Sequence, residues 1–99
     1  FHQRYDLLLT PSMPITALKV GRETTDDDAY GDDWSGWSPY TYPFNLTQQP
    51  AASVPSGLAR NGLPMGVQLA GAPRADAMVL RAAHALEQAM LMPRLPNMA

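Results

Sequence analysis

The chain has 99 residues, which is enough for one small domain and too few for two. Its formal net charge of −2 excludes the basic surface of nucleic-acid-binding proteins, and its lack of cysteine excludes thiolate catalysis, disulfides and cysteine zinc sites. No apolar run approaches the roughly 20 residues that span a bilayer, so we expect no membrane partner and a cytoplasmic protein.

The first predicted element is a short strand. Residues 5–10 include three consecutive leucines and end at Pro11. An apolar run without alternation is typical of a strand that is covered on both faces of its sheet. We therefore expect this strand to be buried on both sides.

Residues 19–50 follow neither the period of a strand nor that of a helix, so we expect a long irregular loop. Aromatic side chains are concentrated in it, at Trp34, Trp37, Tyr40, Tyr42 and Phe44. Such side chains either line an apolar ligand pocket or anchor a loop on a core. Their spacing alone favours anchoring, and pocket lining stays open.

Two further strands are predicted in the second half. The first covers residues 51–55, between prolines. The Asn-Gly pair at 61–62 predicts a tight turn. After it, Met65, Val67 and Leu69 alternate with Gly66, Gln68 and Ala70, and this period of two predicts another strand.

A helix is predicted from Asp76 to about Met92, because this stretch avoids Gly and Pro and is rich in strong helix formers. Asp76 suits the N-cap or the first turn, and Pro93 stops the helix. One face is apolar and carries Val79, Ala83, Leu86 and Met90. The opposite face is polar and carries Arg81, His84 and Gln88.

Two features indicate that the chain is part of a larger domain. A single helix can cover only one face of strands that are expected to be buried on both. A connection of about thirty residues without its own periodicity is also rare inside a compact domain of this size. We expect the loop to lie across a larger body. The alternative is a small α+β domain with a long aromatic-rich binding loop.

The acidic residues do not indicate a metal site. The run 26–28 followed by Gly31 has the start of an EF-hand calcium loop. Tyr30 and Trp37, however, stand where oxygen ligands are needed, and the two histidines lack the spacing of a zinc pair. We therefore expect no metal and no cofactor.

Local motifs indicate no nucleophile either. None of the serines lies in a Gly-x-Ser-x-Gly elbow. Lys19 is the only lysine, and no serine stands in Ser-x-x-Lys spacing to it. No glycine-rich loop of the phosphate-binding type occurs.

A series of short motifs runs through the second half: Tyr42-Pro43-Phe44-Asn45-Leu46-Thr47, Gln49-Pro50-Ala51-Ala52-Ser53-Val54-Pro55, Gly57, Asn61-Gly62-Leu63-Pro64-Met65-Gly66-Val67-Gln68-Leu69 and Leu80-Arg81-Ala82-Ala83. Their order and spacing resemble the C-terminal part of the amidase signature family. Residues 5–11 resemble the strand that precedes this block, and the resemblance is weakest over 20–33. It implies an α/β fold, to which this chain supplies short strands of a mixed central sheet and one C-terminal helix.

The resemblance also implies an amidohydrolase, in which a nucleophilic serine is activated through a second serine by a lysine while backbone N–H groups stabilise the oxyanion. The motifs that carry these groups lie upstream in the family and have no counterpart in this chain, so no catalytic residue is carried over. The block at 37–45 is expected to border the acyl pocket. Its expected substrate-binding residues are Trp37, Ser38, Tyr40, Thr41 and Asn45.

Two positions depart from the family's pattern. Gln48 stands where members commonly have glycine, and it adds strain of about 1 kcal/mol if that position has a positive φ. Ser38 stands where the tRNA-dependent amidotransferase branch has an acid that helps to hold the amino group of glutamine. A hydroxyl cannot replace that charge, so the resemblance favours a general amidase that acts on other amides.

We therefore interpret residues 1–99 as the C-terminal part of a single, incomplete amidase domain, with a long irregular aromatic-rich loop over 19–50. The parent protein is expected to cleave linear carboxylic amides to acid and amine or ammonia, and this chain alone to be inactive. Expected partners are the N-terminal remainder of the domain and a small-molecule amide, with a homodimer left open. Two alternatives stay open: a small non-enzymatic α+β module with an aromatic-rich loop for a ligand or partner, and a fragment of the A subunit of a tRNA-dependent amidotransferase.

Overall fold

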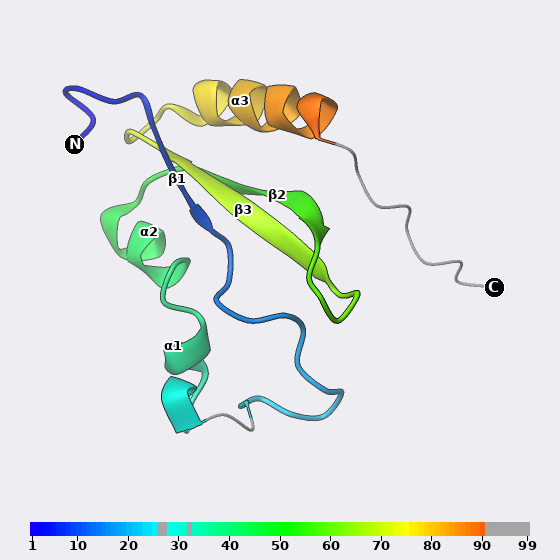
Figure 1. Ribbon diagram of the computed structural model, residues 1–99. Coiled ribbons are helices and arrows are strands. Elements are labelled where there is room, and N and C mark those ends of the chain that lie inside the picture. Colours follow the sequence, from blue (N-terminus) through cyan, green and yellow to red (C-terminus); the bar gives the residue numbers. More distant parts are fainter. Residues whose placement is uncertain (26–27, 32, 91–99) are drawn as a thin grey trace.

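The computed structural model describes residues 1–25, 28–31 and 33–90 (Figure 1). The fold is of the mixed α/β class, as the sequence predicts. Its elements in chain order are β1 (Leu7–Pro11), the 3₁₀ turn η1 (Asp28–Tyr30), α1 (Trp34–Trp37), α2 (Tyr42–Thr47), β2 (Ala51–Leu58), β3 (Pro64–Gly71) and α3 (Asp76–Ala89).

The three strands form one antiparallel sheet in the order β1-β3-β2. A turn over 59–63 joins β2 to β3. In it the Asn61 side-chain oxygen accepts a hydrogen bond from the Leu63 N–H at 3.2 Å, and Gly62 has a φ of 79°. Glycine adopts this left-handed conformation without steric cost. The tight turn predicted from the Asn-Gly pair is confirmed.

Strand β2 is longer than the five residues predicted from its sequence. It continues past Pro55, through a register shift between Pro55 and Gly57, and ends at Leu58. A proline has no N–H to donate to a ladder, but an edge strand with a bulge tolerates one. The sequence-based end at Pro55 therefore fell three residues short.

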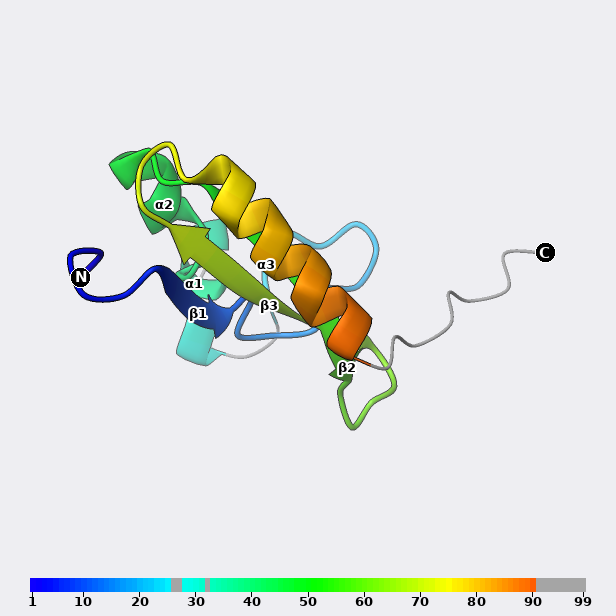
Figure 2. The same ribbon diagram turned by 90° about the horizontal axis from the view of Figure 1, so that it is seen from above.

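Helix α3 covers one face of the sheet (Figure 2). Side chains alternate between the two faces along each strand. Val54, Leu69 and Val79 are the larger buried side chains on the covered side, each less than a tenth exposed. The helix can lie close because Gly71 has no side chain: a Cβ there would come within 2.7 Å of Val79 Cγ2. The core therefore lies between β2, β3 and α3.

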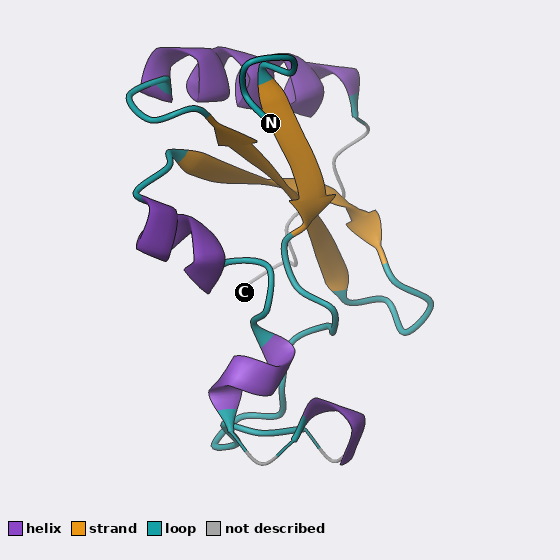
Figure 3. Cartoon of the chain, turned by 90° about the vertical axis from the view of Figure 1, so that its left-hand side faces the viewer, coloured by secondary structure: helices purple, strands orange, loops and turns teal. Residues whose placement is uncertain are grey.

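The opposite face of the sheet carries polar side chains. The strand register places Thr10, Ser53 and Gln68 on it, since Thr10 and Ser53 both lie opposite Gln68. Helices α1 and α2 lie on this side, away from α3 (Figures 1 and 3). The same face also carries Leu8 and the fully buried Ala70, so a mixed polar and apolar side of the sheet faces the aromatic-rich segment.

Helix α3 has the polarity predicted from its sequence. Val79 is buried, Ala83 and Leu86 are half-buried, and the side chains of the polar face are exposed. Asp76 lies in the first turn and Ala75 is the N-cap. The helix ends at Ala89 with an extended C-cap, and the last two residues of the predicted helix, 91 and 92, lie outside the described residues.

The prediction that the first strand is buried on both faces is wrong for this chain. Strand β1 lies at the edge of the sheet. Leu9 is 59% exposed, and Leu7 and Leu8 are only half-buried. The leucine run is apolar on both sides, but α3 packs mainly on β2 and β3.

The segment expected to be irregular, residues 19–50, contains η1, α1 and α2, each at most six residues long. Such short helices show no sustained period in a sequence, because they complete at most two turns. Within the described residues, no helix combines the length and apolar character that crossing a membrane requires.

Candidate functional site

Four of the five expected substrate-binding residues lie in one short stretch of backbone. Trp37 ends α1, Thr41 is the N-cap of α2, and Ser38 and Tyr40 lie between the two helices. We call residues 37–41 the linking turn. Asn45 lies one helical turn further on, within α2, and its side chain is exposed.

Asp33 is the N-cap of α1, and its carboxylate caps the first turn. It accepts hydrogen bonds from the Ser35 N–H at 2.7 Å and from the Ser35 hydroxyl. These bonds hold the pKa of Asp33 below its ordinary value, and the bond from the Ser35 hydroxyl has the larger effect. A carboxylate with a lowered pKa is a weak base. Asp33 is therefore suited to capping a helix and poorly suited to activating the Ser35 hydroxyl.

The Ser38 hydroxyl is turned into the linking turn. The side chain is 6% exposed, and its Oγ donates to the Trp34 carbonyl at 2.9 Å. The Thr41 hydroxyl in turn donates to the Ser38 carbonyl at 3.3 Å. Both hydroxyl protons are used within the turn, so these two side chains can offer a ligand only their oxygen lone pairs.

The aromatic side chains near the linking turn differ in what they contact. The Trp37 indole N–H donates to the Glu23 carbonyl at 2.7 Å. The same ring borders a small cavity of about 190 Å³, together with residues 13 and 15–18. Trp34 and Tyr42 meet edge to face, with ring centres 6.2 Å apart. Trp37 therefore both anchors the loop and lines a cavity, while Tyr40 is 36% exposed.

Gln68 of β3 joins the linking turn to the sheet. It is 6% exposed, and its Nε2 donates to the Tyr40 carbonyl at 2.7 Å and to Thr10 Oγ1 at 3.2 Å. Sequence reasoning missed this residue. The alternation of β3 did place Gln68 on the face opposite the apolar side chains, but no local pattern shows that a segment 28 residues earlier covers that face.

A second polar contact crosses the same face of the sheet. Ser12, just after β1, and Ser53 of β2 bring their hydroxyl oxygens to 2.5 Å, and Gly66 of β3 lies between them. A Cβ at Gly66 would come within 3.0 Å of both oxygens. The absence of a side chain at Gly66 therefore leaves room for the hydroxyl pair.

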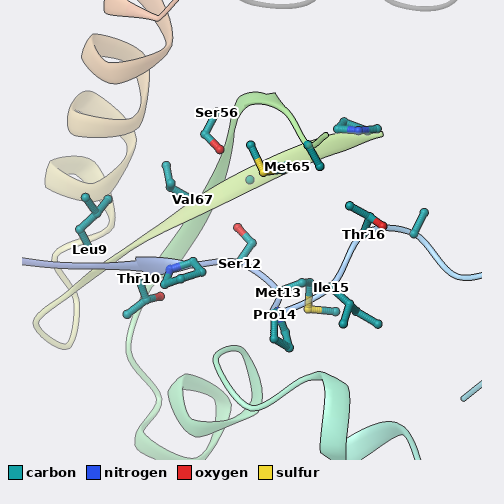
Figure 4. Close-up of a pocket in the computed structure, with 15 residues that line it drawn as sticks. Leu9, Thr10, Ser12, Met13, Pro14, Ile15, Thr16, Ser56, Met65 and Val67 are labelled. Carbon is teal, nitrogen blue, oxygen red and sulfur yellow. The ribbon is translucent and has the colours of Figure 1, made fainter. Parts of the chain in front are cut away.

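A larger cavity of about 650 Å³ lies where β1 leaves the sheet (Figure 4). Leu9, Met65 and Val67 line it from the strands, and Figure 4 shows Thr10 pointing to the other side of β1 from Leu9. Residues 13–17 form another wall, and of these Met13 and residues 15–17 also border the small cavity next to Trp37. The walls are mostly apolar, as is usual for small-molecule sites.

The end of α2 has the strained backbone that a glycine would relieve. Gln48 has a φ of 54° and a ψ of 36°, which is the left-handed conformation. Gln48 therefore has the positive φ under which the sequence predicts strain at this position. The next residue, Gln49, donates through Nε2 to the Gly71 carbonyl at 2.9 Å and accepts from Thr47 Oγ1 at 2.8 Å.

Among residues 1–25, 28–31 and 33–90, no group of three or more acidic or histidine side chains could hold a metal ion. Asp26, Asp27 and Asp32 of the acidic cluster lie outside these described residues.

Comparison with known proteins identifies the family. The family model described as Amidase matches residues 1–80. The chain is 44% identical over 87 residues to the A subunit of the glutamyl-tRNA(Gln) amidotransferase of Geotalea daltonii, and 46% identical over 86 residues to that of Brevibacillus brevis. These matches cover 87% and 85% of this chain, but only 17% and 16% of the relatives.

Two solved structures share the fold. The A subunit of the glutamyl-tRNA(Gln) amidotransferase of Thermotoga maritima matches with a TM-score of 0.77 and 38% identity, over 94% of this chain and 19% of that one. A 6-aminohexanoate cyclic dimer hydrolase matches with a TM-score of 0.72 and 31% identity, over 94% of this chain and 21% of that one. The chain thus spans about a fifth or less of the proteins it matches, and it belongs to the amidase signature family.

Proposed function

We propose that this chain is the substrate-side part of an amidohydrolase, and that the nucleophile belongs to the remainder of the amidase domain. The observation that carries the proposal is the linking turn. Its backbone is tied to the sheet by the bond from Gln68 to the Tyr40 carbonyl, and its Trp37 borders a small cavity. Apolar walls with a few polar groups are what a pocket for a small amide needs.

The partners of the serine hydroxyls support the second half of this proposal. Ser12 and Ser53 bond to each other, Ser38 bonds to a backbone carbonyl, and Ser35 bonds to the carboxylate of Asp33, whose pKa is lowered. A nucleophilic serine instead needs a neighbouring base that accepts its proton. We therefore infer that the serine–serine–lysine group comes from the remainder of the domain and that this chain alone does not hydrolyse amides.

The linking turn favours linear amides with uncharged or aromatic acyl groups. Ser38 carries no charge that could pair with an amino group, and its hydroxyl proton is used within the turn. The rings of Trp37 and Tyr40 offer apolar surface instead. Thr41 and Asn45 are the remaining polar side chains that could orient an amide.

The test is kinetic and uses an enzyme in which this chain is joined to the remainder of its domain. Tyr40→Ala should change the ratio of kcat/KM between bulky and small amides by about tenfold, the order expected of pocket contacts, and leave the Tm nearly unchanged. Tyr42→Ala is the control, because Tyr42 is equally exposed but contacts Trp34. Equal losses on every substrate for Tyr40→Ala, with a large drop in Tm, would mean that the ring is structural.

A second candidate function is part of the A subunit of a tRNA-dependent amidotransferase. The names of the Geotalea daltonii and Brevibacillus brevis relatives favour it, at 44% and 46% identity. Assays of the same joined enzyme distinguish this candidate function from the general amidase. Faster hydrolysis of simple aryl or alkyl amides than of glutamine supports the general amidase, and the reverse order supports the amidotransferase. The cytoplasmic location and the homodimer stay predictions.

A further inference from the structure

A hydrogen bond from a buried side chain joins the linking turn to the sheet. Helix α3 packs on β2 and β3, whereas α1 and α2 make few contacts with any strand. Figures 1 and 3 show α1 extending away from the sheet. The position of the linking turn therefore depends on its own contacts with the sheet and not on packing of α1 or α2.

The Gln68 carboxamide is placed to do this. A backbone carbonyl can only accept a hydrogen bond, so the group of Gln68 that faces the Tyr40 carbonyl at 2.7 Å must be its NH₂. The other N–H of this group donates to Thr10 Oγ1 at 3.2 Å. Because Gln68 is 6% exposed, water has little access to replace these bonds.

Gln49 makes the comparable contact at the other end of α2, where its Nε2 donates to the Gly71 carbonyl. Gln49, however, lies two residues before β2 and is held near the sheet by the chain itself. Tyr40 is eleven residues from the start of β2 and has no such restraint. The bond from Gln68 therefore supplies a restraint on the Tyr40 backbone that the chain itself does not.

We propose that Gln68 is the positioning residue of the linking turn: it holds the Tyr40 backbone against β3 and thereby sets where the Tyr40 and Trp37 rings stand. The role of the linking turn in selecting the acyl group rests on the proposed function. The positioning itself does not, and it can be measured in the 99-residue chain.

Tryptophan fluorescence reports on α1 and the start of the linking turn, because the two tryptophans of the chain are Trp34 and Trp37, the first and last residues of α1. In a Trp34→Phe background, which keeps an aromatic ring against Tyr42, acrylamide quenching measures the exposure of Trp37. Gln68→Met should remove the protection of Trp37 from quenching while the circular dichroism of α3 persists. Gln88→Met is the matched control, because Gln88 is exposed on α3, and it should leave quenching unchanged.

Gln68→Glu gives a signature that a loss of packing would not give. An ionised carboxylate only accepts hydrogen bonds and would oppose the Tyr40 carbonyl, whereas the protonated acid has one O–H to donate. Burial disfavours the charge, so the folded-state pKa of the new carboxyl should rise above the ordinary value of about 4.3 for glutamate. Protection of Trp37 should then be present below that value and be lost as the pH rises through the higher folded-state pKa.

The results that overturn the proposal are distinct from those that overturn the function. Equal quenching of Trp37 with and without Gln68→Met in the Trp34→Phe background contradicts the positioning role. So does a Trp34→Phe chain whose Trp37 is quenched as strongly in buffer as when it is unfolded in guanidinium, because Trp37 then has no protection to lose. If Gln68→Met unfolds α3, the pH step of Gln68→Glu decides, and its absence contradicts the role. If the quenching results hold but the joined enzyme shows no change in acyl selectivity with Gln68→Met, the positioning stands and the proposed function of the linking turn fails.

Discussion

The region 51–90 and the region 33–47 are held in different ways. Strands β2 and β3 and helix α3 enclose Val54, Leu69 and Val79, each less than a tenth exposed. Helices α1 and α2 are held instead by hydrogen bonds to backbone groups, such as the one from Trp37 to the Glu23 carbonyl. Burial is spread over many atoms, whereas each of these bonds depends on one donor. Stability should therefore reside in the first region and the adjustable geometry of a site in the second.

The largest effect should come from the core. Leu69→Ala should lower the free energy of unfolding by about 3 kcal/mol, because it removes buried methyl groups and leaves a cavity under α3. Urea denaturation followed by circular dichroism measures this. Leu80→Ala on the outer face of α3, where Leu80 is 65% exposed, is the control and should change the free energy by less than about 0.5 kcal/mol. Similar losses for both variants would mean that α3 does not form the core.

A smaller effect of opposite sign is expected at the end of α2. Gln48→Gly should raise the free energy of unfolding by about 0.5 kcal/mol. A φ of 54° costs a residue with a side chain about 1 kcal/mol, which glycine avoids, but the greater conformational freedom of glycine in the unfolded chain offsets part of this stabilisation. Gln88→Gly inside α3 should instead lower it by about 1 kcal/mol. The same denaturation experiment compares them. A loss of stability with Gln48→Gly would contradict the left-handed conformation of Gln48.

The smallest effect concerns the cap of α1. Because the folded-state pKa of Asp33 is below its ordinary value of 3.8, the stabilisation of α1 by this carboxylate is present above pH 3.8 and is lost as the pH falls through the lower folded-state pKa. The fluorescence of neighbouring Trp34 should report this as a step below pH 3.8. Asp33→Asn should abolish the step. A step of the same size and midpoint in that variant would assign it to another group.

The same contrast explains what the sequence could predict. The hairpin turn, the polarity of α3 and the α/β class depend on local signals, such as the Asn-Gly pair and the spacing of Val79 and Leu86. The short helices α1 and α2 have no such signal. The sequence predicted the candidate substrate-binding residues within 37–45, but it did not predict which residues they contact. The contact between Gln68 and the Tyr40 carbonyl and that between Ser12 and Ser53 join residues distant in sequence, and only the sheet brings them together.

The central claim is that this chain borders the substrate without supplying the nucleophile. The most direct test treats the isolated chain with a serine-reactive fluorophosphonate and measures its intact mass, alongside hydrolysis of small aryl and alkyl amides. A full-length amidase of the family is treated in parallel as the positive control. We predict no adduct and no hydrolysis, because the hydroxyls of Ser12 and Ser53 bond to each other and not to a base. Hydrolysis of the amides by the isolated chain that stops when one phosphonate binds per chain, at any of its serines, would contradict the claim.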